Sequence, residues 1–142
     1  MFSKEASKQL RQDFWISFGK SYPRKWTLYH TKTKGLAFKF HFDTEKAMVS
    51  LDIETTDLAH RIQLWEKLLS LKTILIKEYL PQAIFEDTFF LETKKEISRI
   101  YVLKKKVSIH NKNTWQETME FLSKTMHAFE AFYGDYQEII VS

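Results

Sequence analysis

Strict alternation of apolar and polar residues defines two neighbouring strands in the first half of the chain. Residues 36–42 (LAFKFHF) and residues 48–55 (MVSLDIET) each place their large apolar side chains on one face. The polar residues 43–46 between them predict a tight turn. A one-residue slip would move a whole apolar set to the wrong face, so the pattern also predicts the register. The predicted pairs are Phe42 with Ala47, Phe40 with Val49, Phe38 with Leu51, and Leu36 with Ile53.

Helical spacing of apolar residues predicts a first helix over residues 3–19 and a last helix over residues 113–133. Ser3 is suited to cap the start of the first helix, and Gly134 is suited to end the last one. The segment 139–141 that follows is Ile-Ile-Val. We expect so apolar a tail to dock on the body of the domain or on a partner.

A long central helix is predicted over residues 58–79, with Asp57 as its N-cap and Pro81 just beyond its end. Its main apolar stripe consists of Leu58, Ile62, Trp65, Leu69 and Ile76. A second apolar set consists of Leu64, Leu68, Leu71 and Leu75. Together the two sets are wider than one sheet face requires. We predict either that this helix lies between two layers or that it supports a contact between subunits.

Three further stretches have strand-like composition, namely residues 25–31, 84–92 and 97–103, and the last two form a second hairpin. The predicted order of elements is therefore α-β-β-β-α-β-β-α. There is no internal repeat, low-complexity tract or linker. We predict a single α+β domain over residues 1–142, with a mostly antiparallel sheet of about five strands and three helices on one face.

Composition excludes several classes of chemistry. The chain has no cysteine, which excludes disulfides, thiolate metal sites and cysteine nucleophiles. Its three isolated glycines cannot form a P-loop or a dinucleotide fingerprint, and its five histidines lack metal-ligand spacing. We predict no cofactor and no catalytic residue. Without a long apolar run or a signal-peptide stretch, we expect a cytoplasmic protein that does not contact a membrane.

The net charge of +4 is mild, and the basic residues are scattered in small groups. Two of these groups adjoin aromatic residues, in SYPRKW at 21–26 and RIYVLKKK at 99–106. Such pairs can stack bases and hold phosphates, although core packing and solvated loops explain them equally well. The residues assigned to this nucleic-acid hypothesis are Arg24, Lys25, Lys39, Arg99, Lys104, Lys105 and Lys106.

Asp52 and Glu54 leave the same face of their strand and are the candidate metal ligands. The order of helix, three strands and helix resembles the core of restriction-endonuclease-type nucleases, which requires a further acidic residue nearby. The predicted register places Asp52 opposite Ala37, about 20 Å from Asp43 at about 3.3 Å per residue. We therefore interpret this face as solvated, with an exposed ion pair between Asp52 and Lys39.

Arg99 alternates with its apolar neighbours, so it shares a strand face with Tyr101. At that position it could meet an aspartate or glutamate from a neighbouring strand. We predict a structural ion pair for Arg99.

Residues 11–20 and 97–133 together resemble a bacterial family of domains of unknown function. In that family Ser-Arg-Ile opens a strand and a tryptophan opens the final helix. The matching residues here are Ser98, Arg99, Ile100 and Trp115. Longer members carry this region after a nuclease-like domain, which implies an accessory role near DNA transactions, and we expect the present chain to be a stand-alone form. The resemblance supplies no catalytic residue.

These observations favour a non-catalytic interaction module that is accessory to DNA transactions, with a second copy of the chain or another protein as partner. One alternative is a nucleic-acid-binding module. Another is a divergent metal-dependent nuclease of restriction-endonuclease type that uses Asp52 and Glu54.

Overall fold

The computed structural model describes residues 2–26 and 31–142. Its elements are α1 (Lys4–Ser21), β1 (Leu36–Phe42), β2 (Lys46–Ile53), α2 (Leu58–Ser70), the short α3 (Lys72–Ile74), β3 (Ile84–Phe90), β4 (Glu96–Lys105) and α4 (Trp115–Val141). A π-helical turn, Leu75–Tyr79, follows α3, and a 3-10 turn, Lys112–Thr114, precedes α4. No helix in the described part of the chain is long and apolar enough to cross a membrane.

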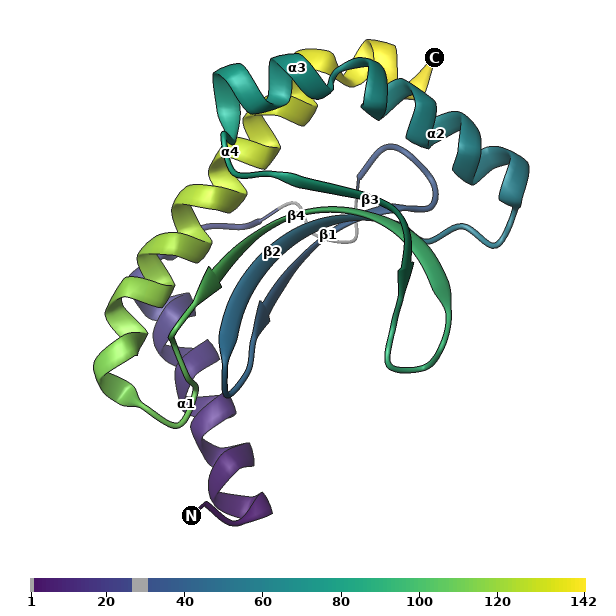
Figure 1. Cartoon of the computed structure of the whole chain (residues 1–142). Helices are drawn as coiled ribbons and strands as arrows, with labels where there is room; N and C mark the ends of the chain where they lie inside the picture. Colours follow the sequence, from purple (N-terminus) through teal and green to yellow (C-terminus); the bar gives the residue numbers. More distant parts are fainter. Residues whose placement is uncertain (1, 27–30) are drawn as a thin grey trace.

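The four strands form one antiparallel sheet in the order β1-β2-β4-β3, and the helices cover its convex side (Figure 1). The α+β class and the placement of the helices on one face are confirmed. All four predicted pairs of the central hairpin are present in the register of β1 and β2. The register holds because it keeps the alternating apolar residues of both strands on the side of the core beneath the helices, among them Phe38 of β1 and Leu51 of β2.

The predicted number of strands is wrong for the described residues, which form four strands and not five. The fifth predicted strand is the stretch 25–31, and its residues 27–30 lie outside the described residues. Its described ends, Lys25, Trp26 and Thr31, are not in a strand. Trp26 packs edge-on against Phe40, with ring centroids 5.6 Å apart, so its aromatic character serves the core.

The predicted number of three helices is also wrong, because the described residues form four α-helices. The central helix is interrupted, where one continuous helix was predicted. It ends at Ser70, and the backbone N–H of Leu71 donates to the carbonyls of Leu68 and Leu69 before α3 and the π-helical turn continue the path. Leu68, Leu71 and Leu75 are buried on both sides of the break. Because the apolar spacing continues through the break, the sequence pattern gave no sign of it. The N-cap at Asp57 is confirmed, since its side chain accepts from the backbone N–H of His60 at 3.2 Å.

The predicted end of the last helix at Gly134 is also wrong, because α4 continues through this residue to Val141. Glycine costs a helix interior about 1 kcal/mol, but buried residues on both sides, Tyr133 and Ile140, anchor the helix here. The expected docking of the apolar tail is confirmed for Ile140, which is fully buried. Its neighbours Ile139 and Val141 remain exposed.

Candidate functional site

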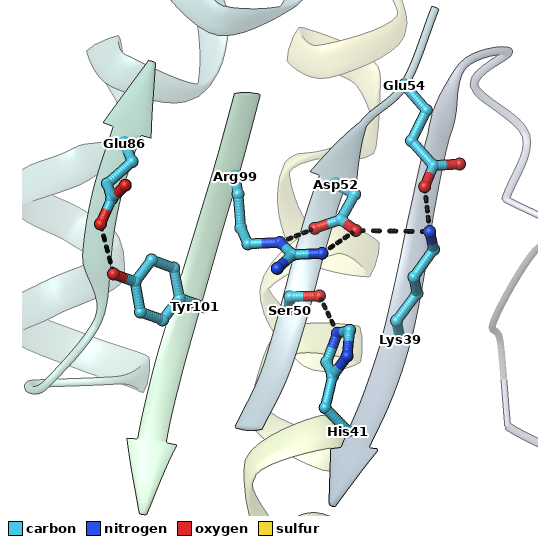
Figure 2. Close-up of polar contacts among 8 residues, drawn as sticks. All are labelled: Lys39, His41, Ser50, Asp52, Glu54, Glu86, Arg99 and Tyr101. Atoms are coloured by element: carbon cyan, nitrogen blue, oxygen red, sulfur yellow. Dashed lines mark hydrogen bonds and ion pairs between the residues drawn. The ribbon is translucent and has the colours of Figure 1, made fainter. Parts of the chain in front are cut away.

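The face of the sheet turned away from the helices carries charged and polar side chains from all four strands (Figure 2). The alternation that places Val49 and Leu51 in the core places Ser50 and Asp52 on this second face. We call it the polar face. Its polar members are Lys39, His41, Ser50, Asp52, Glu54, Glu86, Arg99 and Tyr101.

The centre of the polar face is a buried ion pair between Asp52 of β2 and Arg99 of β4, which are direct partners in the sheet register. Arg99 donates from Nε to Oδ1 at 2.7 Å and from Nη2 to Oδ2 at 2.8 Å. The side chain of Asp52 is 0% exposed and that of Arg99 is 3% exposed. The guanidinium carbon of Arg99 also lies 4.2 Å from the centroid of the Phe89 ring. The planar, two-bond geometry is the strong form of this interaction.

This pair confirms the prediction that Arg99 meets a carboxylate from a neighbouring strand. It corrects the prediction that Asp52 lies on a solvated face with an exposed ion pair. Asp52 is buried because the sheet curves toward this side (Figure 1), which crowds the side chains on its concave surface. Alternation along one strand indicates which face a residue occupies but not how far that face is closed to solvent.

Lys39 lies beside the central pair and contacts both candidate metal ligands. Its Nζ is 3.5 Å from Oδ2 of Asp52 and forms an ion pair with Glu54. The expected neighbourhood of Lys39 and Asp52 is confirmed, and the ammonium group lies between the two carboxylates, where a cation would bind. Asp43 is not brought to this point, since its side chain accepts from the backbone N–H groups of the turn. The described residues contain no cluster of three or more histidines, aspartates or glutamates that could hold a metal ion.

Two neutral groups complete the polar face. His41 Nε2 lies 2.9 Å from Ser50 Oγ, and burial, assisted by the nearby Arg99 charge, lowers the pKa of His41 to about 4. Tyr101 donates its hydroxyl to Glu86, and burial together with this hydrogen bond raises the pKa of Tyr101 to about 12. Neither pKa suits proton transfer near neutral pH. The contacts on the polar face instead join each strand of the sheet to its neighbour.

Lowering the pH is expected to destabilise the protein through His41. The pKa of His41 is 6.5 unfolded and about 4 folded, so below about pH 6.5 the unfolded chain binds a proton that the folded chain excludes. Stability then falls by up to about 1.4 kcal/mol per pH unit down to about pH 4. In urea denaturation, a His41→Gln variant should lose about 2 kcal/mol less between about pH 7 and pH 5 than the parent. Equal losses in both proteins would contradict this account.

The seven residues of the nucleic-acid hypothesis lie in three separate places. Lys39 and Arg99 belong to the polar face. Residues 104–106 lie at the end of β4, where Lys104 pairs with Glu117 of α4 at 3.2 Å. Arg24 and the exposed Lys25 follow α1. The structure therefore does not join these seven residues into one basic patch.

The sequence pattern did not indicate several of the residues that form these contacts. Glu86 was missed because a register shift between Glu86 and Phe89 breaks the alternation of β3. The partners of Arg24, which are His127 and Glu130 of α4, are more than 100 residues away along the chain. No local spacing could have linked them to Arg24.

The two apolar sets of the central helix differ in their exposure to solvent. Leu64, Leu68, Leu71 and Leu75, the second set, are all buried. In the main stripe, Trp65 packs against Phe85 with ring centroids 5.8 Å apart. The remaining large residues of that stripe on α2 are open to solvent: Leu58 is 58% exposed, Ile62 is 48% exposed and Leu69 is 43% exposed. We call these three residues the α2 stripe.

Comparisons with curated proteins and with solved structures find no match for this chain. A family model, however, matches residues 10–137, which is nearly the whole chain and includes all four strands. The chain belongs to the family described as a domain of unknown function (DUF4268).

Proposed function

We propose that this chain is a non-catalytic interaction module that self-associates through the α2 stripe. The observation that carries the proposal is the exposure of Leu58, Ile62 and Leu69 on one side of a single helix. Isolated exposed aliphatic residues are common on protein surfaces, but large residues repeated at helical spacing form a continuous apolar strip. The core does not require this strip, because the second apolar set of the helix already fills it.

The spacing of the stripe suits a second copy of the same helix. The pair Leu58 and Leu69 has the same midpoint in the sequence as the pair Ile62 and Trp65. Trp65 is not part of the α2 stripe, but it is half-buried and lies on the same side of the helix. Two α2 helices packed antiparallel about a two-fold axis would therefore place Leu58 opposite Leu69 of the second copy, and Ile62 opposite Trp65 of the second copy. Such self-complementarity is what a symmetric dimer interface requires.

One alternative surface for self-association is the edge of β3, which the sequence of β3 disfavours. A β-bulge between Glu86 and Phe89 interrupts the ladder of this edge strand. Antiparallel pairing of two β3 strands about their central residue would also bring Asp87 opposite Asp87 of the second copy. Bulges and acidic residues are devices that protect sheet edges from pairing. The α2 stripe is therefore the surface to test.

Light scattering across a concentration series tests the proposal directly. We expect the parent protein to form a dimer at high concentration and Ile62→Glu to weaken that dimer about 30-fold or more, since disrupting a central interface residue costs about 2 kcal/mol or more. Because Ile62 is 48% exposed, the melting temperature of the dissociated variant should match that of the dissociated parent.

The matched control is Ile16→Glu on α1, where the isoleucine is 57% exposed and lies outside the α2 stripe. This variant should associate like the parent. A parent that stays monomeric at the highest attainable concentration overturns the proposal. So does an Ile62→Glu variant that dimerises as tightly as the Ile16→Glu control.

A further inference from the structure

A second surface, away from the α2 stripe, has the chemistry of a small-molecule site. A pocket of about 420 Å³ lies between the segment after α1 and the middle of α4. Its size is within the range of natural ligand pockets. The residues that supply its chemistry are Tyr22, Pro23, Arg24, Trp26, Lys124 and His127. The pocket joins parts of the chain that are about 100 residues apart.

Arg24 is held in a defined position at this pocket. Its Nη2 donates to Oε1 of Glu130 at 2.6 Å, and its Nη1 donates to Nδ1 of His127 at 2.8 Å. A guanidinium group only donates, so Nδ1 of His127 is the acceptor and the ring hydrogen is on Nε2. The Arg24 side chain nevertheless remains 42% exposed. Arg24 and the Nε2–H group of His127 can therefore present fixed donors to a ligand.

Aromatic side chains provide flat surfaces beside these donors. The guanidinium carbon of Arg24 lies 4.5 Å from the centroid of the Trp26 ring. Trp26 is in turn stacked on Phe18, with ring planes 9° apart. Tyr22 also packs on Phe18, with ring centroids 5.4 Å apart. Since Phe18 is buried, the aromatic surfaces are anchored to the core.

We propose that this pocket binds a nucleotide unit, an aromatic base carrying a phosphate group. The base would stack on Tyr22 and on the layer formed by Arg24 and Trp26, as bases do on aromatic rings and guanidinium planes. The phosphate would be held by Lys124, which is exposed at the pocket. Glu130 offsets the charge of Arg24, so the ammonium of Lys124 supplies the net positive charge that a phosphate requires. This inference is independent of self-association.

The test is a binding titration followed by NMR, with adenosine monophosphate, a mixed-sequence single-stranded oligonucleotide and inorganic phosphate as separate probes. The first two probes should shift the indole signal of Trp26 and the ring signals of His127, and inorganic phosphate should bind more weakly than either. Tighter binding of the oligonucleotide identifies a nucleic-acid strand as the ligand. Tighter binding of the mononucleotide identifies a free nucleotide.

Two lysine variants distinguish binding at the pocket from a general effect of positive charge on the protein. Lys124→Gln should lower the affinity for the oligonucleotide about tenfold and reduce its salt dependence by about one counterion. Lys8→Gln removes the same charge from an exposed position on α1 and should bind like the parent. Equal weakening in both variants overturns the proposal. It is also overturned if phosphate binds as well as the mononucleotide, or if no probe shifts Trp26 and His127.

Discussion

Replacing Arg99 by alanine is expected to lower the free energy of unfolding by about 3–5 kcal/mol, because it leaves the buried carboxylate of Asp52 without its main partner. Lys39, at 3.5 Å, is already shared with Glu54 and can replace only part of the lost interaction. The pair also joins the two middle strands of the sheet, β2 and β4, so its loss affects the whole fold. Urea denaturation monitored by circular dichroism measures the change.

The control for Arg99 is Lys46→Ala, which removes an exposed ion pair with Asp43 and should cost less than about 1 kcal/mol. A second comparison replaces both partners, as Asp52→Leu with Arg99→Met. This double variant should recover much of the stability lost in Arg99→Ala, because no unpaired charge remains buried. A loss for Arg99→Ala no larger than that for Lys46→Ala would show that the buried pair does not hold the sheet.

Replacing Phe14 by alanine is expected to cost about 3–5 kcal/mol, since Phe14 is fully buried and attaches α1 to the rest of the domain. Its ring centroid lies 4.6 Å from that of Phe42 on β1 and 5.4 Å from that of Trp115 on α4. The cavity left by the ring would loosen both contacts. Thermal unfolding measures the loss, and limited proteolysis should show earlier cleavage in α1.

Ile16→Ala provides the matched control on the same helix. Ile16 is 57% exposed, so its truncation should change stability by no more than about 0.5 kcal/mol. Similar losses for Phe14→Ala and Ile16→Ala would contradict the role of Phe14 as the anchor of α1.

The local pattern of residues was sufficient to predict the central hairpin and two helix caps. The register of β1 and β2 follows from alternation together with the position of the turn, because a one-residue slip would move one strand's apolar residues to the other face. Ser3 and Asp57 were recognisable as caps, since a cap is a contact within a few residues of sequence. The same reasoning predicted that Arg99 would pair with a carboxylate across the sheet, although it could not name Asp52.

Only the tertiary structure shows which side chains are buried, because burial depends on packing between distant elements. Both apolar sets of the central helix satisfy helical spacing, and only the position of α2 over the sheet shows that Leu64 and Leu68 are buried while Leu58 and Ile62 are exposed. Likewise Asp52 is buried because four strands curve together, which no single strand encodes.

The sequence by itself therefore determined the α+β class, the central register and the absence of cysteine chemistry. Only the tertiary structure placed Arg24 beside His127, since that contact spans about 100 residues. The physical reason is one of range: alternation and capping act between near neighbours, whereas burial and pocket formation depend on how distant elements pack.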